Sequence, residues 1–202
     1  MNLKYVLSLG AALLFSGCEI SVCKAPVGDT PLDITKETEA WEGFWNLYAS
    51  AGNVCSIGKG ETLPVVVHVR DASNGVLRVH LDYPDDMTKG VEPKLPSFYD
   101  VYLRKAGDWI LASVDISFLS GTNGPSCFAW GRVKKGKRVA YLWWASKSML
   151  DKLQEEGKAP QYVPKNSDIL EAFNSNHVAQ VTSGTNGVPF LWDTPWLFIK
   201  QD

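Results

Sequence analysis

The feature that most constrains this chain is the strict alternation of apolar and polar residues over short segments in its middle. Val65, Val67 and Val69 fall on one face of such a segment, whereas His68 and Arg70 fall on the other. Successive side chains of a β-strand point to opposite faces, so a period of two predicts a strand with one buried face. Several such segments follow one another, and the chain is therefore expected to be mainly β.

Three hairpins are predicted from pairs of these segments. The first joins residues 63–70 to 76–83 through Ser73-Asn74-Gly75, where glycine suits the left-handed position of a three-residue loop. This register would set His68 opposite His80. The second and third hairpins pair residues 98–104 with 109–118 and residues 127–133 with 138–145.

The remaining segments complete a predicted barrel. A first strand is expected over 41–48, and closing strands over 177–182 and 188–200, the last limited by Pro189 and Pro195 to an edge or a broken strand. The total is about eight antiparallel strands. Eight strands close into a barrel whose interior holds side chains or one small ligand.

Two short late helices are also predicted. The first begins at Ser146 or Ser148 and ends at Gly157; the second begins at Ser167 and carries an apolar stripe to Phe173. Aromatic residues on both faces of the strand 138–145 predict that a helix or loop covers its outer side.

The first 17 residues have the pattern of a signal peptide. Lys4 is followed by an apolar run from Val6 to Phe15, and Ser16 and Gly17 are small. At about 1.5 Å per residue, this run spans roughly half of the hydrocarbon layer, so it is too short to cross it.

The segment 13–18, Leu-Leu-Phe-Ser-Gly-Cys, resembles the lipobox of bacterial lipoproteins. The resemblance implies that Cys18 is lipidated and that the protein is anchored by its acyl chains, with Glu19 favouring the outer membrane over the inner one. Several acyl chains anchor a protein stably, whereas one binds only marginally. Ordinary secretory cleavage with unmodified Cys18 is the alternative, because Phe15 is bulkier than the usual residue at its position.

Residues 18–38 are predicted to be a lipidated tether, and 39–202 a single domain. The tether segment is polar and contains Pro26 and Pro31, and about 18 flexible residues would reach roughly 25 Å. A short helix is expected near its end, over 33–40.

An envelope location predicts a disulfide, because that compartment is oxidising. Cys55 and Cys127 both lie in the predicted folded region, whereas Cys23 lies in the predicted tether, so a bond between Cys55 and Cys127 is expected. The alternative is three unpaired thiols, and a partner for Cys23 stays open.

Gly43-Phe44-Trp45, on the first strand and after a possible short helix, resembles the Gly-x-Trp signature of lipocalins. The strand-then-helix segment 141–158 is similar to small bacterial lipocalin-like proteins. The resemblance implies a lipocalin-like barrel over 35–202, in which Gly43 and Trp45 are structural. No Thr-Asp-Tyr motif follows, and two late helices depart from the single helix of that family.

The expected function is that of an anchored binding module for a small apolar molecule or a lipid. The high aromatic content motivates it, and core packing is the alternative for each tryptophan. The candidate ligand-binding residues are Trp45, Trp109, Trp130 and Trp143. The competing hypothesis is a protein-binding inhibitor or immunity-type lipoprotein of the envelope, which would use the loop 83–96 and the repeated Ser-Gly-Thr-Asn-Gly turns at 120–124 and 183–187.

Other classes of function are not favoured. The chain has 20 basic and 22 acidic residues, and cleavage of the leader would remove one basic residue, Lys4. The remaining 19 basic and 22 acidic residues give a net charge of about −3, which lacks the electrostatic signature of a nucleic-acid-binding protein. No catalytic motif is present, so the chain is not expected to be an enzyme or to need a cofactor. His68 and His80 lie on polar strand faces, which favours solvent exposure over a metal site.

Overall fold

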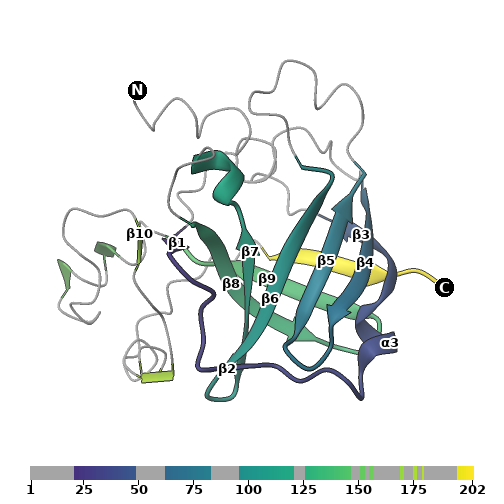
Figure 1. Cartoon of the computed structure of the whole chain (residues 1–202), viewed down its shortest axis with the longest axis horizontal. Coiled ribbons are helices and arrows are strands. Elements are labelled where there is room, and N and C mark those ends of the chain that lie inside the picture. Colours follow the sequence, from purple (N-terminus) through teal and green to yellow (C-terminus); the bar gives the residue numbers. More distant parts are fainter. Residues whose placement is uncertain are drawn as a thin grey trace.

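A computed structural model describes residues 21–48, 62–82, 96–120, 126–146 and 195–202, with the short pieces 151–152, 155–156, 169–170, 175–176 and 179. Eight antiparallel strands form a closed barrel (Figure 1). They are β3 (Gly43–Tyr48), β4 (Leu63–Asp71), β5 (Val76–Leu81), β6 (Phe98–Ala106), β7 (Trp109–Asp115), β8 (Phe128–Lys135), β9 (Val139–Trp144) and β11 (Trp196–Lys200). Each strand from β3 to β9 pairs with the next, and β11 closes the barrel between β9 and β3. The predicted eight-stranded antiparallel barrel is confirmed.

The three predicted hairpins are confirmed, with one change of register. Gly75 and Gly107 have φ of 63° and 59°, the left-handed backbone that their turns require. A bulge between Val69 and Asp71 shifts the first hairpin, so that His68 pairs with Arg78 and His80 with Val66. The predicted pairing of His68 with His80 is therefore wrong by two residues. The bulge accounts for one of them, and the turn accounts for the other, because Asp71 pairs with Val76 and leaves four residues, 72–75, in place of the predicted three-residue loop.

The closing strand differs from its prediction. β11 starts directly after Pro195 and pairs on both sides, with β9 and with β3, so the predicted edge position is wrong. Proline removes a ladder donor only at its own position, and here it precedes the first paired residue. The predicted alternative, a strand broken by its prolines, falls on residues 188–194, which lie outside the described residues. The predicted strand 109–118 also ends early, because residues Ser117–Ser120 form the 3₁₀ helix η1.

The helix predictions fare less well. The helix with defined bounds in the described chain is α3 (Thr38–Trp41), at the end of the segment 33–40 where a short helix is expected. The predicted helix from Ser167 is wrong at Ile169–Leu170, which form the strand β10. The helix predicted to end at Gly157 falls largely outside the described residues, but its described residues 151, 152 and 155 are helical as predicted. Ala179 is helical where a strand is predicted.

The predicted tether is wrong from residue 21 onward, because this segment packs along the barrel. β1 (Val22–Cys23) pairs with β8 and β10, and β2 (Thr30–Pro31) pairs with β6. Between them, the Val27 amide donates to Ser113 Oγ at 2.9 Å. The folded unit therefore begins well before residue 39. Apolar residues spaced through a polar sequence supply the packing: Val22, Val27, Leu32 and Ile34.

The predicted signal peptide and Cys18 lie outside the described residues. No helix in the described chain is both long enough and apolar enough to cross a membrane.

Candidate ligand cavity

The barrel encloses an apolar cavity. Its empty volume is about 920 Å³, including the open space at its mouth, and its wall presents no polar surface. All eight barrel strands and α3 contribute to the lining. The lining residues are Trp41, Trp45, Leu47, Val65, Val67, Leu77, Val79, Leu81, Tyr99, Val101, Leu103, Ala112, Val114, Val133, Ala140, Tyr141, Leu142, Trp144, Trp196 and Phe198.

One end of the cavity is closed by two tryptophans. Trp45 Nε1 donates to the Trp41 carbonyl at 3.0 Å, which holds α3 beneath the start of β3. Gly43 has φ of 119°, and a side chain there would meet Lys200 Cε at 3.3 Å. Glycine at this position therefore allows both the positive φ and the close passage of the lysine.

Two lysines lie over the same rings. Lys135 Nζ is 5.0 Å from the centre of the Trp45 ring and 5.5 Å from that of Trp41, and Lys200 Nζ is 5.9 Å from that of Trp45. Such contacts are cation–π interactions. Burial lowers the pKa of Lys135, and the positive charge of Lys200 lowers it further. The closed end is therefore packed as well as positively charged.

Aromatic side chains dominate the other half of the cavity. Trp144 and Trp196 meet edge to face, with ring centres 5.1 Å apart, and Trp196 also contacts Phe198 at 6.5 Å. These residues were not singled out from the sequence. The sequence signal that could have found them is the alternation of inward and outward residues along a strand. Trp144 lies on the same face of its strand as Leu142, and Trp196 lies on the same face as Phe198.

Of the four tryptophans predicted to bind ligand, Trp45 alone lines the cavity. Trp130 lies on the opposite face of β8, fully buried, and donates to Ser21 Oγ at 3.2 Å. Trp109 lies under the Arg132 guanidinium at 4.3 Å, and Trp143 stacks on Tyr141 with ring centres 5.6 Å apart. The structure thus brings one predicted residue into the site and leaves three on the outward faces of their strands.

The cysteines give no support to the predicted disulfide. Cys23 and Cys127 are both buried, and no disulfide is formed among the residues that the structure describes. Cys55 lies outside those residues, so its bond to Cys127 stays a prediction. Cys23 lies in β1, where it pairs with Phe128 of β8, so it belongs to the folded unit. The reason for excluding it from the predicted disulfide, its place in a tether, is therefore wrong.

The polar groups provide no metal site in the described part of the chain, where no three His, Cys, Asp or Glu side chains gather. His68 lies beside Glu42, with Nδ1 3.6 Å from Oε1, and its side chain is 64% exposed. Asp115 follows Leu111 and Ser113 on the outward face of β7, and its carboxylate accepts the Ser117 amide at 2.9 Å.

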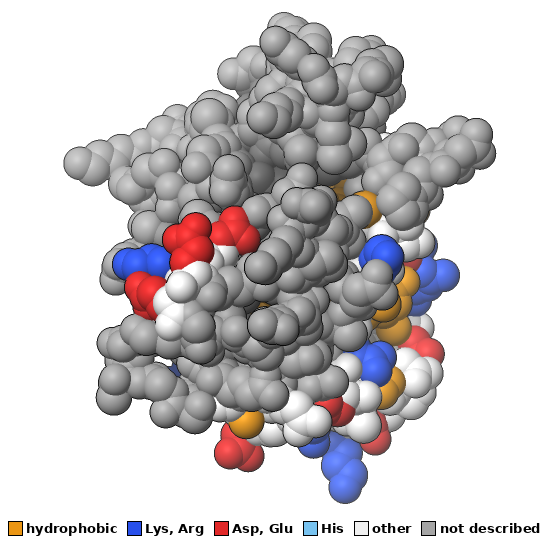
Figure 2. All heavy atoms as spheres, turned by 90° about the vertical axis from the view of Figure 1, so that its left-hand side faces the viewer, with side chains coloured by type: hydrophobic (Ala, Val, Ile, Leu, Met, Phe, Trp, Pro, Cys, Tyr) orange, Lys and Arg blue, Asp and Glu red, His pale blue; other side chains and the backbone are white. Residues whose placement is uncertain are grey.

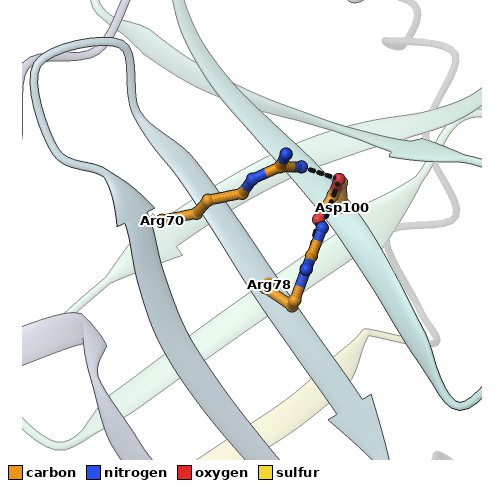
Figure 3. A network of polar contacts seen from close by, with 3 residues as sticks. All are labelled: Arg70, Arg78 and Asp100. Carbon is orange, nitrogen blue, oxygen red and sulfur yellow. Dashed lines mark hydrogen bonds and ion pairs between the residues drawn. The ribbon is translucent and has the colours of Figure 1, made fainter.

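The outer surface of β4–β6 carries an ion-pair cluster (Figure 3). Arg78 donates to both oxygens of Asp100, with distances of 2.9 Å from Nε and 3.2 Å from Nη2, and Arg70 donates to the same carboxylate. The Arg78 guanidinium also lies 4.2 Å from the centre of the exposed Phe98 ring. Phe44 lies farther along this surface and is 68% exposed.

Comparisons of this chain with protein-family models, with curated proteins and with solved structures give no match. The likeness to lipocalins therefore depends on the barrel and on the residues Gly43 and Trp45.

Proposed function

We propose that this protein is a lipid-anchored, lipocalin-like binding module of the bacterial cell envelope, which holds a small apolar molecule or a lipid in its barrel. The observation that carries the proposal is the cavity: the barrel is not filled by its own tryptophans. Its volume, without the open space at the mouth, is about 130 Å³. That is close to the roughly 150 Å³ of an apolar protein cavity that binds benzene, so it suits a small apolar molecule or part of one acyl chain.

The wall chemistry favours an aliphatic or aromatic ligand. A polar molecule would lose its hydrogen bonds to water on entering an apolar cavity, at a cost of roughly 1–3 kcal/mol per group. Each CH₂ group transferred from water contributes about 0.8 kcal/mol in the opposite direction. Affinity should therefore rise with chain length until the cavity is full.

The location of the module comes from the sequence. Lipidation of Cys18 would hold it on a membrane outside the cytoplasm, with the outer membrane favoured by Glu19. Metabolic labelling with a palmitate analogue tests this part, and labelling should be lost in Cys18→Ser.

Tryptophan fluorescence tests binding, because Trp41, Trp45, Trp144 and Trp196 line the cavity. The unlipidated Cys18→Ser protein is titrated with saturated fatty acids of increasing length. We expect a saturable change at micromolar ligand that grows with chain length. No response at high micromolar concentrations of any of them would contradict the proposal.

A matched pair of variants localises the site. Ala112→Phe places a ring inside the cavity, whereas Lys134→Phe places one on the exposed outer face of β8. The first variant should weaken binding at least tenfold, and the second should bind as the parent does. Circular dichroism checks that both barrels fold.

The exposed outward residues of β3–β6 support a second candidate, a protein-binding inhibitor or immunity-type lipoprotein. Four outward residues form a row across these strands: Phe44 pairs with Val66, Val66 with His80, and His80 with Phe98. Arg78 lies beside this row, against the Phe98 ring. Exposed aromatic and arginine side chains dominate the energetics of many protein interfaces. Capture of an envelope protein that is lost in Phe44→Ser/Phe98→Ser, but not in Ala112→Phe, would favour this function over lipid binding.

A further inference from the structure

The N-terminal segment fixes where an anchored chain must leave the barrel. The Ser21 amide donates to the Ala145 carbonyl at 2.9 Å, and the Ser21 hydroxyl accepts Trp130 Nε1. Directly after it, Val22 pairs with Ala129 and Cys23 with Phe128. Ser21 is therefore held at the start of β8 and just beyond the end of β9.

This position identifies one end of the barrel, which we name the anchor rim. It consists of the strand ends at Tyr48, Leu63, Leu81, Phe98, Asp115, Phe128, Trp144 and Trp196. The opposite end carries the turns at Gly75, Gly107 and Gly136 together with α3 (Figure 1). Trp41 and Trp45 close the cavity at that opposite end, which we name the closed end.

The segment after Ser21 braces this arrangement over the height of the barrel. The Asp29 amide donates to Lys105 O at 2.7 Å, and the Ile34 amide donates to Ala72 O at 2.9 Å, both at the closed end. Residues 21–34 therefore run from the anchor rim to the closed end, held at both ends. The start of the segment is not free to swing away from the rim.

Chain length then restricts the distance to the membrane. Cys18 precedes Ser21 by three residues, and three extended residues span at most about 11 Å. An 18-residue tether would have allowed roughly 25 Å in any direction. With lipid on Cys18, Ser21 stays within about 11 Å of the lipidated cysteine, so the part of the anchor rim at β8 and β9 stays close to the lipid headgroups.

We propose that the anchor rim docks on the membrane leaflet that holds the acyl chains, with the cavity facing the bilayer and the closed end facing away. This inference rests on the lipid anchor of the proposed function, and it names the ligand class: an acyl chain of a lipid drawn from that leaflet. Phe98, exposed at the rim, offers an apolar ring of the kind that enters the boundary between headgroups and acyl chains. Six strand residues at about 3.3 Å each, tilted by about 40° from the barrel axis, place the closed end roughly 15 Å farther out.

Two fluorophore positions measure this orientation in the full-length lipoprotein, reconstituted in phosphatidylethanolamine–phosphatidylglycerol vesicles with a headgroup quencher. Ser97→Cys labels the anchor rim and Asp108→Cys labels the closed end; both positions are exposed. Cys55→Ser is present throughout, since Cys23 and Cys127 are buried. Quenching at position 97 should exceed that at position 108 at least threefold. Equal quenching, or stronger quenching at position 108, would overturn the proposal.

A linker insertion separates docking from anchoring. About 16 Gly/Ser residues between Glu19 and Ile20 add a reach of roughly 20–24 Å. The insertion should reduce the quenching difference between the two labels and slow the uptake of a fluorescent phospholipid from the vesicles at least threefold. The same insertion between Gly136 and Lys137, at the closed end, should change neither measurement. Uptake unaffected by the first insertion would contradict capture from the leaflet.

The outcomes distinguish this inference from the proposed function. Fatty-acid binding in solution with equal quenching at both labels refutes docking and leaves the cavity function standing. Unequal quenching without any fatty-acid binding refutes the cavity function and leaves docking standing. Absence of palmitate at Cys18 refutes the anchor and the docking together.

Discussion

The barrel has two outer surfaces that are built differently. Over β6–β8 the N-terminal segment covers the strands, and Leu111, Ser113 and Trp130 are fully buried there although they point away from the cavity. Over β3–β5 the described chain places no covering segment, and Phe44 and His68 are largely exposed. From the side on which β1 and β10 lie, the described surface shows charged and polar side chains with small apolar patches (Figure 2).

The difference lies in the outward residues and not in the alternation itself. Both surfaces follow the same period of two. On the covered side, Ser113 and Trp130 use their polar atoms for hydrogen bonds with the segment above, whereas Arg70, Arg78 and Asp100 on the open side pair with one another. Buried polar groups need partners, and exposed charges remain hydrated. Outward residues of a strand therefore indicate whether something covers it.

The largest predicted effect concerns Cys23, which would react as an ordinary thiol if its segment were a tether. It is 0% exposed, and burial raises its pKa, so little thiolate forms. Alkylation should be slower than in the urea-unfolded chain by on the order of 10³-fold or more, since it needs local opening. Iodoacetamide kinetics in a Cys18→Ser/Cys55→Ser/Cys127→Ser background measure the rate. Equal rates in the folded and unfolded chains would restore the tether.

Truncation of Ile34 should reveal how strongly the covering segment holds the barrel. Ile34 is buried in the main core, so Ile34→Ala should lower the free energy of unfolding by about 2–5 kcal/mol. Lys36→Ala, two residues away and exposed, should change it by less than about 0.5 kcal/mol. Urea denaturation measures both. A cost for Ile34→Ala as small as that of the control would mean that the segment contributes no stability.

The hydrogen bond between Trp130 and Ser21 should be worth less. A double-mutant cycle with Trp130→Phe and Ser21→Ala should give a coupling free energy of about 0.5–1.5 kcal/mol, typical of a buried hydrogen bond. Urea denaturation of the four proteins supplies the cycle. A coupling energy of zero would show that the start of the segment detaches in solution, which would also weaken the docking proposal.

The ion pair on the open surface should contribute less again. Asp100→Asn keeps the shape and removes the charge that Arg70 and Arg78 share, so the expected loss is roughly 0.2–1 kcal/mol. The loss should shrink in 1 M salt, because exposed charges are screened. A salt-independent loss larger than that of Ile34→Ala would reverse the contrast between the two surfaces.

The smallest effect is a pH dependence at the turn of the open surface. Hydrogen bonds from the Asn74 side chain, the Ser73 hydroxyl and the Asn74 amide lower the pKa of Asp71 below 3.8. The unfolded state therefore binds more protons in this range, so the stabilisation is present above the unfolded pKa and is lost as the pH falls through the folded one. Asp71→Asn should flatten stability against pH below about pH 4. An unchanged slope would show that these bonds do not persist in solution.

Much of the barrel was predictable from local pattern. Alternation predicted the three hairpins, and turn chemistry predicted the glycine at Gly75. The alternation of inward and outward residues along β7 also places Ala112 and Val114 inside. The same rule, applied to β8, would have placed Trp130 outside the cavity. Aromatic content, used in place of this alternation, selected Trp109 and Trp143 instead of Trp144 and Trp196.

The amino-acid sequence by itself determined the barrel strands, their direction and the apolar face that each turns inward, because these follow from interactions between residues close in the chain. It did not determine the short strands β1, β2 and β10, which form by pairing with distant segments. The tertiary structure decided the bulged register at Val69, the pairing of β11 on both of its sides and the packing of residues 21–34 along the barrel. These depend on partners far away in the chain, such as Val27 and Ser113, which are 86 residues apart. From its sequence alone, a polar segment with prolines is expected to be a flexible tether. It becomes ordered when a folded surface supplies hydrogen-bond donors, acceptors and apolar contacts that offset the entropy lost on ordering.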